Sequence, residues 1–154
     1  MNKINSNIFK LAMSKYATGV TIVTINNKEK YLGKTVNSFA ALSLKPPLIL
    51  FSLDKKSSSL NIFKKSSFIG INILSKNQNK LSNYFSLKNS LWKNTPSTLS
   101  KNNVPLIKNC VANIDCKKIK LINQGDHILF ICKVNAIKIN EKKKSLIYLN
   151  SKYI

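Results

Sequence analysis

Apolar side chains along this chain mostly follow the alternating or continuous patterns of β-strands. Such runs predict strands at residues 20–25, 31–44, 48–53, 68–74, 106–116, 119–121, 127–139 and 146–148. The run at 48–53 is almost entirely apolar, so we expect that strand to be buried on both faces. Pro46 and Pro47 interrupt the pattern before it, and Gly33 marks a bulge or a close backbone approach. Many strands with few helices predict a β-barrel with helical additions.

Three short segments have helical features instead. Apolar residues recur at helical spacing in 6–19, with Ser6 as the expected N-cap and Gly19 at the end. The serines at 57–59 stand before another apolar segment, which predicts a second helix capped by hydroxyl groups. Ser75 is expected to cap a third helix.

Residues 87–104 are polar and lack periodicity, which predicts a long surface loop. Phe85 and Trp92 flank or lie in this loop, where they either cover a bound ring system or belong to the core. No linker, repeat or low-complexity boundary divides the chain, so residues 1–154 are expected to form a single domain.

The net charge of +21 raises the question of a nucleic-acid or membrane-surface partner. All 26 basic residues are lysine, whereas proteins that read nucleic acid usually include arginine for its bidentate geometry. The lysines are also scattered, and their longest run is 142–144. We therefore expect a solvated basic surface that attracts anionic ligands, with no specific nucleic-acid partner and no membrane partner.

The three cysteines, Cys110, Cys116 and Cys132, lack CxxC spacing, and the single histidine does not complete a zinc set with them. No metal site is therefore expected. Buried thiols in a reducing compartment are the expected state. No apolar stretch approaches the ~20 residues that span a bilayer, and residues 1–10 lack the apolar core of a signal peptide. The expected location is the cytoplasm.

Acid–base machinery is sparse, because the sequence has five acidic residues and no obvious carboxylate pair. No nucleophile elbow, P-loop or GxGxxG motif is present either. Hydrolysis and phosphoryl transfer are therefore disfavoured, and no residue is assigned as a catalytic acid, base or nucleophile. A reaction whose chemistry belongs to a bound cofactor demands less of the side chains.

Two segments have the chemistry to hold such a cofactor. Residues 33–38 place hydroxyl, amide and backbone groups along one strand, which suits a flat heterocycle but equally an ordinary polar strand face. Residues 52–59 combine serines and two lysines at a predicted helix N-terminus, where free N–H groups favour an anion. The alternative for this segment is a plain helix cap with surface lysines. A third motif, Gly125-Asp126-His127, opens a strand and contains the histidine, which taken alone is more often structural.

Together these motifs resemble the flavin reductase family, which has the FMN-binding split-barrel fold. The resemblance lies in the ordered set TGVTIVT, GKTVNSFAALSLKPPLILFSLDKKSSSL, FIGINIL, LSNYFS, GDHILFICKV and YLNSKY, from about residue 9 to residue 153. It implies a mainly β, antiparallel Greek-key split barrel with a few peripheral helices. Lys34 departs from the family pattern, which often has an apolar or small residue there.

The resemblance also implies roles by position. The residues matching the segment along the flavin ring and ribityl chain are Thr35, Val36, Asn37 and Ser38, with Ser52, Leu53 and Asp54 beside them. Lys55, Ser57, Ser58 and Ser59 match the phosphate-binding corner. His127 matches a histidine that lies near the nicotinamide.

The implied function is NAD(P)H-dependent reduction of FMN or FAD by hydride transfer, which supplies reduced flavin to a separate oxygenase component. The resemblance further implies a homodimer. Two alternatives are also compatible with the sequence. One is a flavoprotein that keeps FMN tightly and reduces another acceptor, and the other is a non-enzymatic basic protein that binds nucleic acid or a surface.

Overall fold

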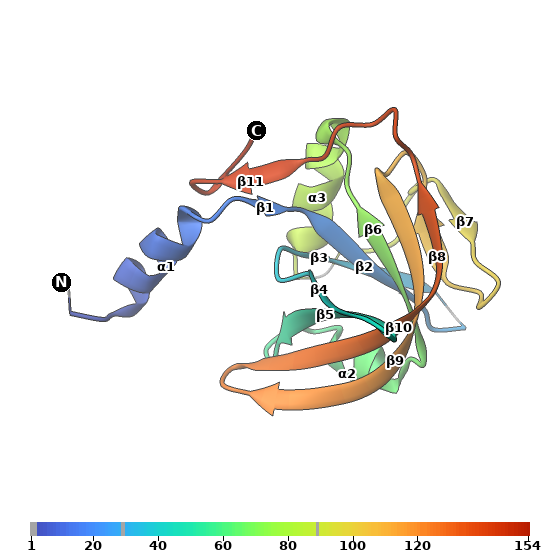
Figure 1. Ribbon diagram of the computed structural model, residues 1–154, viewed down its shortest axis with the longest axis horizontal. Coiled ribbons are helices and arrows are strands. Elements are labelled where there is room, and N and C mark those ends of the chain that lie inside the picture. Colours follow the sequence, from blue (N-terminus) through green and yellow to red (C-terminus); the bar gives the residue numbers. More distant parts are fainter. Residues whose placement is uncertain (1–2, 29, 89) are drawn as a thin grey trace.

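The computed structural model describes residues 3–28, 30–88 and 90–154 as a mainly β fold with helices at its periphery (Figure 1). The helices are α1 (Ser6–Ser14), α2 (Leu60–Lys65) and α3 (Asn79–Ser86), and a 3₁₀ turn η1 (Lys76–Gln78) precedes α3. The strands are β1 (Thr18–Gly19), β2 (Thr21–Asn26), β3 (Tyr31–Val36), β4 (Ala40–Leu44), β5 (Pro47–Asp54), β6 (Phe68–Ile73), β7 (Ser97–Leu99), β8 (Pro105–Ile107), β9 (Ala112–Gln124), β10 (His127–Ile139), β11 (Ile147–Leu149) and β12 (Lys152–Tyr153).

The main sheet of the described chain has seven strands in the order β3-β2-β6-β9-β10-β5-β4, and all neighbours are antiparallel. The sheet curls so that its edge strand β3 comes back beside β5. β1, β11 and β12 form a small second sheet, and β7 pairs with β8. The predicted antiparallel split barrel with peripheral helices is confirmed.

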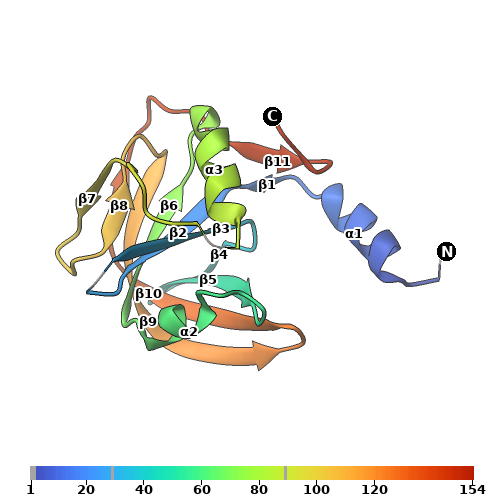
Figure 2. The ribbon, with the colours of Figure 1, turned by 180° about the vertical axis from the view of Figure 1, so that it is seen from behind.

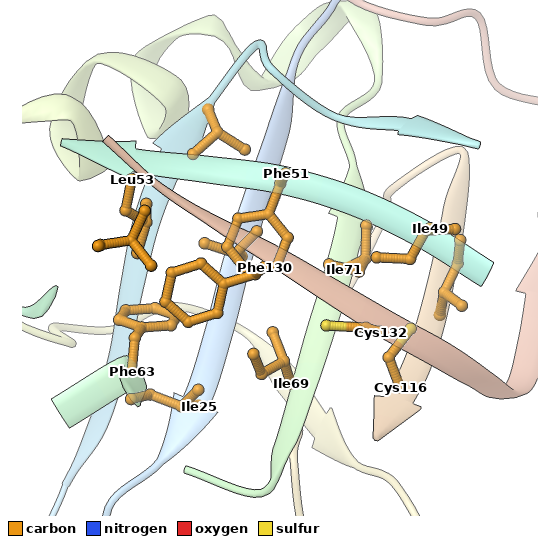
Figure 3. Packing of buried hydrophobic residues seen from close by; sticks show 14 of the residues in the cluster. Ile25, Ile49, Phe51, Leu53, Phe63, Ile69, Ile71, Cys116, Phe130 and Cys132 are labelled. Carbon is orange, nitrogen blue, oxygen red and sulfur yellow. The ribbon is translucent and has the colours of Figure 1, made fainter. Parts of the chain in front are cut away.

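The core fills the inside of this curled sheet (Figure 3). Phe51 on β5 and Phe130 on β10 face each other across the two strands, and their rings stack with centroids 4.8 Å apart. Phe63 of α2 packs below them and is fully buried. Cys116 and Cys132 lie in the same core, and all three cysteines are free and buried, as expected.

A buried polar network joins β8 to the main sheet. The Asn72 amide donates to the carbonyl of Ile22 at 2.9 Å and to the Thr24 hydroxyl at 3.1 Å. Its oxygen accepts from the Ile107 backbone at 2.7 Å and from the Asn113 amide at 2.8 Å. Every polar atom of this fully buried side chain therefore has a partner, which makes the network a stabilising contact rather than a cost.

A second apolar cluster lies between β2, α3 and the C-terminal strands. Phe85 is fully buried there, and its ring centroid is 5.4 Å from that of Trp92. A Cβ atom on Gly33 would lie 2.9 Å from the Phe85 ring, so the close backbone approach expected at this glycine is confirmed. Of the two roles considered for Phe85 and Trp92, the structure shows the core role.

The first helix differs from its prediction at both ends. Its N-cap is Asn5, whose side chain accepts hydrogen bonds from the backbone of Asn7 and Ile8, so Ser6 is not the cap. The helix ends at Ser14, well before Gly19, which belongs to β1. No residue of α1 is buried, and the helix extends away from the barrel (Figures 1 and 2).

The single strand predicted at 31–44 is two strands, β3 and β4, separated at residues 37–39. The strand predicted at 48–53 is buried on one face only. Ile49, Phe51 and Leu53 enter the core, whereas Leu48 and Leu50 on the other face are half-buried. The prediction of burial on both faces is therefore wrong for this chain taken alone.

The C-terminal half follows the prediction with three adjustments. The strand at 127–139 has the predicted bounds, but the segments 106–116 and 119–121 rearrange into the short β8 and the long β9. The predicted loop 87–104 contains β7 within its described residues; position 89 lies outside them. β12 was not predicted, because a two-residue strand has no periodicity to detect.

Candidate functional site

Most of the predicted site residues lie around one cavity, where β3 comes back beside β5. The cavity has a volume of about 200 Å³. Its lining residues are Lys34, Thr35, Val36, Asn37, Ser38, Ser52, Leu53, Asp54, Ser57 and His127. The structure thus brings together three segments that are far apart in the sequence, residues 34–38, residues 52–57 and His127. Of the predicted set, Lys55, Ser58 and Ser59 do not line it.

Strand pairing and one serine position these segments. His127 lies directly opposite Asp54 across the β5–β10 pair, which places the GDH motif beside the C-terminal end of β5. Ser38 follows β3, and its hydroxyl accepts from the Ser52 backbone N–H at 2.9 Å and donates to the Ser52 carbonyl at 3.2 Å. This contact explains why the strand predicted at 31–44 is interrupted: the chain turns toward β5 instead of continuing.

The GDH motif forms the turn between β9 and β10. Gly125 has a φ of 56°, a left-handed conformation that glycine adopts without strain. The Asp126 carboxylate lies 2.7 Å from Nδ1 of His127. The hydrogen bond and charge of His127 lower the pKa of Asp126. An ionised Asp126 requires Nδ1 to carry the proton, so Nε2 of a neutral ring remains as an acceptor.

Lys55 and the serines at 57–59, which the resemblance implies as a phosphate-binding corner, are arranged differently from what the sequence predicted. Helix α2 begins after Ser59, but no side-chain oxygen caps it, so the expected hydroxyl cap is wrong. The Ser57 and Ser59 hydroxyls lie 3.2 Å apart, and the Ser58 hydroxyl donates to the Lys88 carbonyl at 2.6 Å. The Lys55 ammonium donates to the Gly125 carbonyl, which turns it toward the GDH turn.

Lys34 forms part of the cavity wall and is held in place. Its ammonium group donates to the carbonyls of Ser86 at 2.9 Å and Leu87 at 3.0 Å, at the C-terminal end of α3. Cations are stabilised at such helix ends because the free carbonyls carry partial negative charge. Partial burial lowers the pKa of Lys34.

A larger cavity of about 360 Å³ adjoins the first and shares Thr35, Val36 and Asn37 with it. Its other lining residues come from the position before β2, from α3 and from the C-terminal segment that contains β11 and β12: Val20, Ser82, Asn83, Ser86, Tyr148, Ser151 and Tyr153. The Tyr153 hydroxyl lies 2.9 Å from the Ser82 hydroxyl and donates to Asn83 at 3.0 Å. Sequence reasoning did not assign these residues, because only tertiary contacts bring α3 and the C-terminus to β3.

Other chemistry has less support in the described chain. No group of three or more His, Cys, Asp or Glu residues within it is placed to hold a metal ion. Burial raises the pKa of Cys110 and Cys132 to about 12, so these thiols are poor nucleophiles. Asp115 is buried in β9 and accepts from the Asn102 side chain at 3.0 Å, away from the cavity residues.

None of the described helices has both the length and the apolar character needed to cross a bilayer.

Comparison with known proteins gives a consistent result. The family model "Flavin reductase like domain" matches residues 13–154. The FMN reductase (NADH) SmoA of Agrobacterium fabrum is 35% identical over 130 residues, which cover 84% of this chain and 75% of that protein. The reductase subunit HsaB of a flavin-dependent monooxygenase from Rhodococcus jostii is 28% identical over 146 residues, covering 94% and 75%. The structure of the flavin reductase PheA2 in its native state superposes with a TM-score of 0.90, at 34% identity, and covers 98% of this chain and 97% of that one.

Proposed function

Because this chain belongs to the flavin reductase family, we propose that NAD(P)H reduces FMN or FAD in the cavity between β3 and β5. The observation that carries this proposal is the convergence of the flavin segment, the end of β5 and the GDH histidine on one cavity. The chain is an NAD(P)H:flavin oxidoreductase, and the flavin accepts a hydride from the nicotinamide. The reaction needs no acid, base or metal from the protein.

The contribution of the chain is to bind and align two flat ligands. We assign the flavin ring and ribityl chain to the wall formed by residues 35–38 and 52–54, where hydroxyl, amide and backbone groups are available. The serines at 57–59 would hold the phosphate. The cavity of about 200 Å³ and its neighbour of about 360 Å³ share the wall formed by Thr35, Val36 and Asn37, which gives two ligands room to meet at this wall. Alignment of this kind is itself a large part of catalysis.

We propose a separate oxygenase component as the consumer of the reduced flavin, as the name of the Rhodococcus relative indicates for that protein. The three free, buried thiols suit a reducing compartment, which supports the cytoplasmic location that we propose. A steady-state assay tests the function: NADH and NADPH oxidation should accelerate on adding FMN or FAD. Oxidation that needs no added flavin would instead indicate a flavoprotein with a tightly held cofactor. No oxidation at all would favour the alternative of a non-enzymatic basic protein that binds nucleic acid or a surface.

His127→Ala should raise the KM for the nicotinamide nucleotide by about three- to tenfold, because it removes one neutral hydrogen bond worth about 0.5–1.5 kcal/mol. Asp126 holds Nδ1, so Nε2 is the atom that would accept from the nicotinamide carboxamide. Flavin affinity, measured by fluorescence quenching, should change little. An unchanged KM together with a large loss of flavin affinity would show that His127 binds the flavin instead.

We expect a homodimer that covers the outer face of β5 and β10. Ile131 lies opposite Leu50 on that face, and both are half-buried in the single chain. Leu44 on the neighbouring β4 is 89% exposed. Burying such a face stabilises association by roughly 25 cal/mol per Å² of apolar surface. The loss of translational and rotational freedom and the ordering of side chains oppose this gain. Light scattering should give twice the chain mass of 17.3 kDa, and Leu50→Lys should shift the protein toward monomer. A wild-type mass of 17.3 kDa at micromolar concentration would contradict the dimer.

A further inference from the structure

A third cavity, of about 290 Å³, lies between η1 and the turn that leads into β11. Its lining residues are Ser75, Lys76, Asn77, Lys142, Lys143 and Lys144. We call Lys76 and the three lysines at 142–144 the lysine cluster. Glu141 is the acidic residue of this turn, but it does not line the cavity, and none of the four ammonium groups forms an ion pair with a described carboxylate. The cluster therefore places four uncompensated positive charges around one hollow.

Backbone hydrogen bonds fix the two segments that carry the lysine cluster. The Lys76 N–H donates to the Lys144 carbonyl at 2.8 Å, which ties η1 to the turn. Within the turn, Asn140 accepts from two of the lysines: its side chain from the Lys142 N–H at 3.3 Å and its carbonyl from the Lys143 N–H at 3.2 Å. Like charges held together in this way repel each other and lower stability. Such an arrangement is expected where an anionic partner neutralises the charges.

We propose that the lysine cluster docks an acidic segment of a partner protein, whose carboxylates enter the cavity. A small free anion would gain little here, because a single exposed ion pair is weak. A segment with several carboxylates adds several such contacts on one chain. Nucleic acid fits less well, since the chain has no arginine and no aromatic side chain lines the cavity for base stacking.

The lysine cluster also lies beside the proposed site of flavin reduction. η1, which contains Lys76, leads directly into α3, whose Ser82 and Asn83 line the cavity of about 360 Å³. The turn that contains Lys144 leads into β11, whose Tyr148 lines the same cavity. The two segments lie side by side at the top of the molecule in Figure 1. Of the partners proposed above, the separate oxygenase component fits this position, and that identification rests on the proposed function.

Binding of a fluorescein-labelled polyglutamate peptide to the whole chain at low salt, measured by fluorescence anisotropy, tests the proposal. The triple variant Lys142→Gln, Lys143→Gln and Lys144→Gln should weaken peptide binding about five- to tenfold, because each exposed charge pair contributes modestly and three are lost together. The matched control replaces an exposed lysine by glutamine on each of α1, α2 and β9, at Lys10, Lys65 and Lys120. It removes the same charge and should change peptide binding less than about twofold.

Equal weakening by the two triple variants would assign the attraction to the overall charge of the chain and overturn the docking site. A labelled oligothymidylate that binds more tightly than the peptide, and loses affinity only when residues 142–144 are changed, would assign the cavity to nucleic acid and equally overturn it.

Flavin reduction separates this proposal from the proposed function. The rate should stay within about twofold of wild type when residues 142–144 are changed, and also when the peptide is saturating, because the lysine cluster lines neither of the two cavities at β3. Strong inhibition by the peptide would place the peptide in the flavin site and overturn the docking site. Absence of flavin reduction by the wild type would overturn the proposed function and the oxygenase as the partner, whereas peptide binding would still decide the docking site.

Discussion

Ser57→Asp should weaken FMN binding more than tenfold. The Ser57 hydroxyl lines the flavin cavity and lies 3.2 Å from that of Ser59, so a carboxylate there would face the ligand phosphate directly. Losing a hydrogen bond to a charged group costs about 1.5–3 kcal/mol, and repulsion between two like charges adds to this. Flavin fluorescence titration measures the change.

Riboflavin is the first control for this variant, because it has no phosphate and should lose little affinity. Ser67→Asp is the second, since it adds the same charge at an exposed serine that lines no part of the site. Lys55→Glu should have a smaller effect than Ser57→Asp, because the Lys55 ammonium bonds the Gly125 carbonyl rather than lining the cavity. Equal losses for riboflavin and FMN would place the phosphate elsewhere.

Asn72→Ala should lower the free energy of unfolding by about 3 kcal/mol or more. The substitution removes a fully buried amide and leaves the Ile107 N–H and the Ile22 carbonyl without this partner. Each buried polar group left unsatisfied costs about 1–3 kcal/mol. Urea denaturation followed by tryptophan fluorescence measures the loss.

Asn61→Ala is the matched control, since Asn61 is exposed on α2 and its replacement should change stability by less than about 0.5 kcal/mol. Asn113→Ala should give an intermediate loss, because the Asn72 oxygen loses its bond from Asn113 but keeps the one from the Ile107 N–H. A loss below about 1 kcal/mol for Asn72→Ala would show that water or rearrangement replaces the network.

Strong local periodicity explains which parts of the fold were predictable. The strand His127–Ile139 was predicted at its observed bounds, because β-branched and apolar residues fill it between a glycine turn and a polar segment. The break between β3 and β4 was missed because it depends on Ser38 bonding to Ser52 of another strand. The cap of α1 was placed one residue too late, since Asn5 and Ser6 are both good caps in the sequence.

The residues of the candidate site could be predicted where they belong to sequence motifs. They could not be predicted where tertiary contacts alone bring them to the cavity. Residues 35–38 and 52–54 converge on one cavity, as the resemblance implied. The direction of the Lys55 side chain and the contribution of Ser82 and Tyr153 depend on how the GDH turn, α3 and the C-terminus fold back. Lys34 departs from the family pattern, and its side chain lies in the wall of the cavity, where it donates to the Ser86 and Leu87 carbonyls.

Anaerobic mixing of the protein with flavin and NADH shows whether this chain transfers a hydride from the nicotinamide to the flavin. The visible absorbance of the flavin should bleach far faster than without protein, with one NADH oxidised for each flavin reduced. Deuterium at C4 of the nicotinamide should slow this bleaching if hydride transfer limits it, and Ser57→Asp should slow it at subsaturating FMN. Bleaching no faster than in the protein-free solution would show that the chain is not a flavin reductase.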